Sequence, residues 1–370
     1  MMKSYLKLLT TCTAVLLLCT AVAYALDVDG KLNIEGDLAG GYQYQNISDA
    51  PDVDDTGRGA VLFQPTIRFQ LTEQDVVQAK FGFAAGDALN DDASPFLLTP
   101  WATDLEEDVK GIGGRDRDYL LTAWYSHTFG LGSAGVLDIA GGIIDATDYL
   151  DTNAYANDGL TQFMNGALVN GATASLPSYD VGGSAQWELG SWSASAVYMS
   201  VAENDDSNSY RFFGLQAGYN METGFGEGNF RLILDATTDD FNGPDGTSEK
   251  SRTGIMISCD QQFGEILGGW ARIGWQDDDA LVDYQALFSG GINANGSQWA
   301  RPQDTIGVGF AHLNGGNNAI DHSSVIELYY RLVFTEIAAL TVDFQYLIDN
   351  YKTGNDPAGL ISALRFVASF

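Results

Sequence analysis

Charged side chains recur at every second position of segments whose intervening residues are apolar. The set comprises Arg68, Lys80, Arg272, Glu327, Arg331, Asp343 and Arg365. Because successive side chains of a β-strand point to opposite faces, each charge shares a face with polar residues and opposes an apolar face. No nucleophile motif accompanies them. The chemistry that they predict is the binding and orientation of hydrophilic molecules.

Two tryptophans fall on the same polar faces. Trp124 shares its face with Thr122, and Trp270 shares its face with Arg272 and Gln276. Sugar rings carry apolar C–H faces that stack on aromatic rings, and hydroxyl edges that bond to Arg, Asp and Gln. The pattern therefore favours sugar binding. The alternative is that these rings simply wedge against loops.

A long connection carries acidic and aromatic residues together. Residues 145–179 contain Asp145, Asp148, Tyr149, Asp151, Tyr155 and Asp158. A loop of ~35 residues is too long for a mere connection, and such loops are often functional. Facing the wall arginines, these acids would set a transverse field across a narrow opening. We expect that field to orient polar solutes and to resist apolar ones.

These side chains need a scaffold that turns one polar face inward. Alternating segments lie near 32–45, 61–71, 76–87, 118–129, 135–144, 180–189, 191–202, 210–221, 228–238, 250–262, 265–276, 280–292, 304–313, 323–334, 338–348 and 359–370. The predicted fold is all-β, a transmembrane antiparallel β-barrel of about sixteen strands, with fourteen to eighteen allowed.

A lipid-facing Arg or Lys would cost about 2–4 kcal/mol at mid-depth, so the charges face inward. A charged interior implies water and hence a channel. A plugged barrel with paired charges is the alternative.

The connections alternate between short and long. Residues 72–75 and 335–337 read as tight periplasmic turns. Residues 46–58, 88–117, 145–179, 203–209, 239–249, 277–281 and 349–358 read as external loops. This asymmetry is typical of outer-membrane barrels. No linker divides the chain, so residues 26–370 are expected to form one barrel domain.

Both ends of the sequence indicate export to an outer membrane. Lys3 and Lys7 precede an apolar stretch and the small-x-small motif Ala23-Tyr24-Ala25, so residues 1–25 read as a cleaved signal peptide. The last segment places Leu364, Phe366, Ala368 and Phe370 on one face. An apolar face that runs to a C-terminal aromatic is typical of a closing strand, which we expect the barrel-assembly machinery to bind. Lipid and lipopolysaccharide are the expected surroundings.

Composition excludes several classes of protein. The formal net charge is −31, so no basic patch could hold nucleic acid. Acids concentrate in loops, in runs such as Asp104 to Asp108. These runs read as solvated surface, as an acidic vestibule, or as calcium sites that tie loops together. Asp52 to Gly57 resembles the start of a calcium loop, but the twelfth position is Phe63 rather than Glu, which excludes an EF-hand. We expect no cofactor and no metal site.

Several motifs resemble a known family. The segments 142–149, 153–158 and 162–170 resemble the constriction region of carbohydrate-selective porins of the OprB type. Residues 301–310 look like that family's Arg-x-x-Asp turn into a glycine-rich strand, and 326–331 and 340–346 are similar to its closing strands. The similarity covers roughly residues 118–370. It implies a sixteen-stranded barrel that passes glucose and other small sugars.

The sequence leaves other functions open. The acidity favours a general or cation-preferring diffusion porin as the main alternative to a sugar-selective one. An enzyme would need one of the three histidines, His127, His312 or His322, beside a nucleophile and a carboxylate. A structural surface protein is a further alternative, and assembly into a homo-oligomer is compatible with all of these readings. We expect a channel rather than an enzyme.

Overall fold

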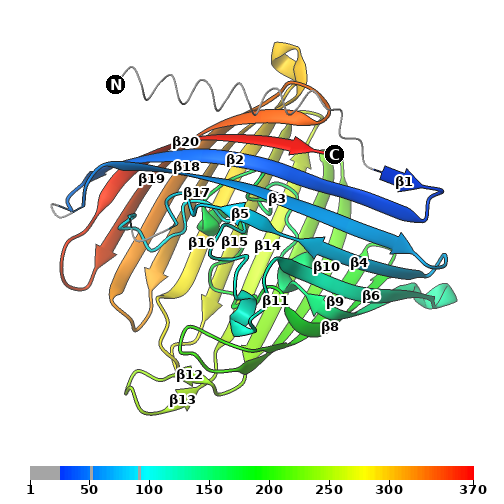
Figure 1. Cartoon of the computed structure of the whole chain (residues 1–370), viewed down its shortest axis with the longest axis horizontal. Coiled ribbons are helices and arrows are strands. Elements are labelled where there is room, and N and C mark those ends of the chain that lie inside the picture. The colour runs from blue at the N-terminus through cyan, green and yellow to red at the C-terminus, as the bar shows by residue number, and fades with distance from the viewer. Residues whose placement is uncertain (1–25, 51–52, 91–92) are drawn as a thin grey trace.

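The computed structural model describes residues 26–50, 53–90 and 93–370, which form a closed antiparallel β-barrel (Figure 1). The predicted signal peptide, residues 1–25, lies outside this description. The wall strands are β2 (Leu32–Ser48), β3 (Thr56–Gln70), β4 (Asp75–Phe81) with β5 (Phe83–Ala85), β6 (Leu120–Gly130), β7 (Val136–Ile144), β8 (Asp180–Leu189), β9 (Trp192–Val201), β10 (Tyr210–Thr223), β11 (Gly226–Thr237), β14 (Thr253–Phe263), β15 (Leu267–Gln276), β16 (Tyr284–Gly296), β17 (Arg301–Gly315), β18 (Ile320–Val333), β19 (Ala338–Tyr351) and β20 (Ala358–Ser369). Each strand pairs with its neighbour in sequence, and β20 pairs with β2 from Asp37↔Ser369 to Ser48↔Ala358. With β4 and β5 counted as one interrupted strand, the wall has the predicted sixteen strands.

The alternation of side chains explains why these segments form a barrel. In β10, Phe212 is fully buried while Phe213 and Leu215 are about half exposed. In β14, Ile257 is 54% exposed while Ser258 and Asp260 are buried. An outer surface of exposed apolar side chains and an interior of buried polar ones is the inverse of a soluble sheet, and it suits a wall surrounded by lipid.

One predicted strand is broken. The segment 76–87 is interrupted at Gly82, whose N–H donates to the Tyr119 carbonyl at 2.9 Å rather than to a wall strand. A Cβ at Gly82 would lie 2.8 Å from the Leu121 side chain, so the close approach requires glycine. The break therefore lies beside Tyr119, where the long connection from β5 to β6 returns to the wall.

The two ends of the barrel differ in the length of their connections. At one end the turns are short, and Gly190, with φ of 59°, closes the two-residue link between β8 and β9. At the other end lie the longer loops, including residues 86–119, 145–179 and 238–252. The last of these carries a small hairpin of β12 (Phe241–Asn242) and β13 (Glu249–Lys250) that the sequence pattern missed. The predicted alternation of short turns and long loops is confirmed.

The chain also forms a few short elements outside the wall. β1 (Leu26–Val28) folds back on the start of β2. Single helical turns occur at Ile112–Gly114, Gly132–Ala134, Ala146–Asp148, Gly166–Val169 (α2) and Ser297–Trp299. Among the described residues, none of the helices has the length and apolar character needed to cross a membrane.

The core lies inside the barrel, where two long loops pack against the wall. Figure 1 shows the connections from β5 to β6 and from β7 to β8 within the ring of strands. The largest buried cluster joins Phe163 and Leu168 of the second loop to Trp270, Leu313 and Tyr329 of the wall. The interior is therefore partly filled by loops rather than open across its width.

Candidate functional site

The loop 145–179 is held inside the barrel by a buried ion pair. Arg272 of β15 and Asp151 of the loop are both fully buried, with Nε 2.8 Å from a carboxylate oxygen. The same guanidinium donates to the carbonyls of Ala156, Leu168 and Val169. One wall arginine therefore neutralises a loop acid and satisfies three loop carbonyls.

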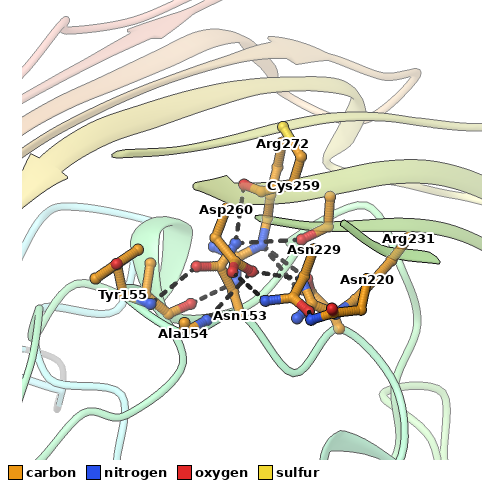
Figure 2. A network of polar contacts seen from close by, with 12 residues as sticks. Asn153, Ala154, Tyr155, Asn220, Asn229, Arg231, Cys259, Asp260 and Arg272 are labelled. Atoms are coloured by element: carbon orange, nitrogen blue, oxygen red, sulfur yellow. Dashed lines mark hydrogen bonds and ion pairs between the residues drawn. The ribbon is translucent and has the colours of Figure 1, made fainter. Parts of the chain in front are cut away.

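A second polar network holds the neighbouring part of the loop to β11 and β14 (Figure 2). Asp260 accepts hydrogen bonds from Asn229 at 2.8 Å and Arg231 at 2.6 Å, and from the backbone N–H of Ala154 at 3.4 Å. Asn153 donates to the Cys259 carbonyl at 3.3 Å. This network fixes the backbone of the loop directly before Tyr155.

The opposite side of the loop is bound by β18 and β20. The Glu327 carboxylate accepts the backbone N–H groups of Met164 at 2.5 Å and Asn165 at 2.9 Å. Arg365 donates to the carbonyls of Gly159 at 2.6 Å and Gln162 at 2.7 Å. Both side chains are fully buried. Loop backbone packed away from water needs such partners, because an unpaired buried N–H or C=O is costly.

These contacts correct part of the sequence prediction. Asp151, Arg272, Glu327, Asp343 and Arg365 were expected to face an open lumen, but all five are fully buried. Four of them take part in the contacts between the loop and the wall. The fifth, Asp343, accepts a hydrogen bond from the side-chain amide of Gln345 at 3.1 Å. The prediction of loop acids facing wall arginines across a gap is wrong for Asp151, because that pair is closed.

The two inward tryptophans are also covered. Trp270 is 5% exposed and packs edge-on against Phe163, with ring centroids 5.6 Å apart. Trp124 is half-buried and packs against the cluster around Ile144, Tyr149 and Met199. The wedge alternative is therefore correct for Trp270, and its proposed role as an open sugar platform is wrong.

The loop 86–119 enters the barrel as well, which the sequence did not indicate. The Pro100 carbonyl accepts hydrogen bonds from Gln43 of β2 at 3.0 Å and Gln345 of β19 at 2.9 Å. Trp101 is fully buried, and its indole N–H donates to the Gly159 carbonyl of the other loop at 3.0 Å. The two loops therefore form one inward layer.

This layer borders an acidic cavity of about 720 Å³. Eight carboxylates line it: Asp37, Asp87, Asp104, Glu107, Asp108, Asp145, Asp148 and Asp158. Within the described part of the chain, Lys80 of β4 is the only lysine or arginine among the lining residues. Of the predicted site residues, the structure thus brings Lys80, Asp145, Asp148 and Asp158 together. The sequence analysis singled out the acids of the 104–108 run but left their role open between solvated surface, acidic vestibule and calcium site.

Asp145 is the most buried acid of this cavity, with 5% exposure. Its carboxylate accepts the N–H of Thr147 at 2.9 Å and the hydroxyls of Thr147 at 2.7 Å and Ser178 at 3.3 Å. Burial, with the nearby Asp148 carboxylate, raises the pKa of Asp145 to about 7. The charge of the cavity therefore changes near neutral pH.

Three of the remaining predicted residues line smaller cavities near the short turns. Tyr155 and Arg331 line a cavity of about 410 Å³, and Tyr149 lines one of about 200 Å³. Arg68 is exposed near the short-turn end of β3 and lines none of these three cavities.

The chemistry available in these cavities is solute binding. Within residues 26–50, 53–90 and 93–370, no group of three or more His, Cys, Asp or Glu side chains could hold a metal ion. The carboxylates, amides and tyrosines can bind hydrated cations and hydroxyl-rich molecules.

Comparison with known proteins gives a consistent result. Residues 102–370 match the family model described as carbohydrate-selective porin, OprB family. An uncharacterized protein of Aquifex aeolicus (strain VF5) is 32% identical over 295 residues, covering 79% of this chain and 82% of that protein.

Solved structures agree at the level of the fold. The high-pH structure of Pseudomonas putida OprB matches with a TM-score of 0.72 at 16% identity, covering 92% of this chain and 95% of that one. The outer membrane channel DcaP of Acinetobacter baumannii matches with a TM-score of 0.56 at 9% identity, covering 94% of this chain and all of that one. At such low identity these structures support the barrel fold alone.

Proposed function

The chain belongs to the carbohydrate-selective porin family OprB, and we propose that carbohydrates are the main solutes of its channel. It is an outer-membrane channel for small hydrophilic solutes. The observation that carries the proposal is the inward loop layer, since the family match covers both the loop 145–179 and the wall strands that bind it. Because the loop 145–179 is bound to the inner wall, it narrows the barrel and brings its side chains into contact with passing solutes.

The experiment is planar-bilayer recording of the purified chain with glucose added. We expect ohmic ion channels whose current is transiently blocked by glucose. Barrels that insert at verified density but conduct no ions would contradict the channel. Channels whose current glucose leaves unchanged at high millimolar concentration would contradict the sugar preference.

Cation preference is a second property that one specific observation favours. The cavity with eight carboxylates and Lys80 carries a strong negative potential, which concentrates cations and repels anions. A sugar channel can have this property, because neutral sugars do not respond to the field. The reversal potential in a KCl gradient measures it directly.

We also propose three features of biogenesis and assembly. Residues 1–25 act as a cleaved signal peptide, and residues 26–370 form the single mature domain. The barrel-assembly machinery binds the terminal strand. In support of this proposal, Phe370 ends that strand in an ordered position: it exchanges two backbone hydrogen bonds of 3.0 Å with Gly36, and its ring stacks on Phe63. The mature barrel contacts lipid and lipopolysaccharide and is compatible with a homo-oligomer.

We further propose that the protein has no enzymatic activity. His127 binds Asp75 at 2.7 Å, and His312 binds Ser324 at 2.8 Å. His322 binds the neighbouring Asp321 at 3.0 Å. Among the described residues, no histidine ring contacts both a carboxylate and a hydroxyl or thiol nucleophile.

A further inference from the structure

A second cavity of about 410 Å³ lies on the short-turn side of the inward loop. Its walls come from Ala154, Tyr155 and Gln162 of the loop, from the turn between β14 and β15, and from strands β15 to β18. It shares only Thr161 with the lining of the acidic cavity. The two cavities therefore adjoin at this residue. Its volume falls within the range of small-molecule sites.

Asn293 of β16 presents an unused acceptor in this cavity. The side chain is 4% exposed, and its Nδ2 donates to the Tyr329 hydroxyl at 2.8 Å. Its Oδ1 is buried and has no hydrogen-bond partner among the described residues. A buried amide oxygen without a partner is unfavourable, so a hydroxyl donor that enters the cavity is favoured. The bond to Tyr329 holds the amide in one orientation.

Arg331 of β18 presents unused donors in the same cavity. The guanidinium groups of Arg231, Arg272, Arg301 and Arg365 all have carboxylate or carbonyl partners, whereas the Arg331 guanidinium makes no hydrogen bond or ion pair with the described residues. Its Nε is buried and unpaired. A guanidinium carries five N–H donors in a fixed plane, so it can bind two neighbouring oxygens of one molecule.

Tyr155, a residue of the inward loop, supplies an aromatic ring to the lining of the same cavity. The ring lies directly on β15, because a Cβ at Gly268 would be 2.2 Å from its Cζ. The backbone of Tyr155 is held by Asn153, which donates to β14 (Figure 2). The ring is therefore fixed by the wall beneath it and by the network beside it.

We propose that Asn293, Arg331 and Tyr155 form a saccharide subsite for a neutral hexose on the short-turn side of the channel. The acceptor and the donors match vicinal hydroxyls, and the ring matches the C–H face of a pyranose. A lone arginine would also attract an anion. However, the eight carboxylates of the adjoining cavity repel anions, and Glu265 adds a further negative charge to the lining of this one. This subsite deepens the sugar passage proposed above and rests on it.

The test is glucose block of single-channel current, with glucose added to one side at a time. Arg331→Gln and Tyr155→Leu are each expected to shorten the glucose dwell time about tenfold while leaving conductance within twofold. Arg331→Lys keeps the positive charge but not the planar guanidinium, so its glucose dwell time should lie between those of wild type and Arg331→Gln. The matched control is Arg211→Gln, since Arg211 is exposed on the outward face of β10 at the opposite end of the barrel. Heat-modifiable migration of each variant on gels verifies folding.

The outcomes separate the subsite from the wider function. Glucose block that is saturable in wild type but unchanged in Arg331→Gln and Tyr155→Leu would overturn the subsite and leave the sugar channel intact. Absence of any glucose block in wild type would overturn both. Tighter block by glucuronate than by glucose, lost in Arg331→Gln, would overturn the assignment to a neutral sugar.

Discussion

At the scale of single residues, the interior charges act mainly as anchors. Arg272 and Arg365 are the charges that a sequence pattern would place in an open lumen, yet both donate to the backbone of one loop. A buried ion pair is not a strong source of stability by itself, but leaving one partner unpaired is costly. The role of such a pair is therefore best tested by comparing single and double variants.

The pair Arg272 and Asp151 gives the first prediction. Arg272→Met leaves the Asp151 carboxylate buried without its partner and should lower the free energy of unfolding by about 3–5 kcal/mol. The double variant with Asp151→Asn should recover a large part of that loss, and Asn tolerates the φ of 57° at this position. Denaturant unfolding in detergent measures both. Equal stability of the single and double variants would show that the ion pair does not hold the loop.

Two less buried acids of the cavity, Asp148 and Asp158, give the second prediction. Replacing both Asp148 and Asp158 with Asn should lower the cation-to-anion permeability ratio by about threefold or more for each acid removed, since one charge at ~7 Å in water interacts with a passing ion by roughly 0.6 kcal/mol. The effect should shrink in 1 M salt, where the Debye length is ~3 Å. Glu336→Gln, in an exposed short turn, is the control. A reversal potential unchanged at low salt would place both acids outside the ion path.

The buried acid Asp145 gives the third prediction. Because its pKa is raised to about 7, it is neutral below this pH and charged above it. Cation preference should therefore fall as the pH is lowered from 8 to 6, well above the ordinary range of a carboxylate. Asp145→Asn should remove the part of this fall near pH 7 and leave the part near pH 6, because burial raises the pKa of Asp108 in the same cavity to about 6. A profile that stays flat from pH 8 to 5 would contradict the role of Asp145.

At the scale of elements, the positions of the strands and the lengths of the loops could be predicted, whereas the paths of the loops inside the barrel could not. The alternation that identifies β2 or β14 is local, so it can be read from a dozen residues. The entry of the loop 86–119 depends on Gln43 and Gln345 meeting at Pro100, which requires residues far apart in sequence to be adjacent. The break at Gly82 depends on this loop and was missed for the same reason. The alternation of apolar and polar residues correctly predicted that Trp270 points inward. It could not predict the packing of Phe163 on Trp270, because that contact depends on the conformation of the loop.

The inward loop 86–119 gives the fourth prediction. Trp101→Ala removes a fully buried ring and its bond to Gly159, and should cost about 3–5 kcal/mol of stability. The loosened layer should raise the single-channel conductance and its noise. Trp192→Ala, on the outer face with 58% exposure, should leave conductance unchanged. Wild-type conductance in Trp101→Ala would show that this loop does not limit the opening.

At the scale of the whole molecule, a closed wall carries an interior built from its own connections. The pairing of β20 with β2 closes the wall and leaves no strand edge with unpaired backbone groups, as a sheet embedded in lipid requires. The interior holds several cavities, among them the acidic one and a smaller amide-rich one, which adjoin at Thr161 of the inward loop. A neutral, hydroxyl-rich solute can pass the first without repulsion and bind in the second. This order of surfaces explains how an acidic barrel can favour sugars.

Uptake into liposomes tests this account most directly. Glucose should enter vesicles that contain the protein at a saturable rate, with half-saturation near the millimolar range, which corresponds to about −4 kcal/mol of binding. An uncharged amino acid of similar size, which lacks the hydroxylated ring, should enter more slowly and without saturation. Equal and unsaturable rates for the two solutes would contradict the account and identify the protein as a general diffusion porin.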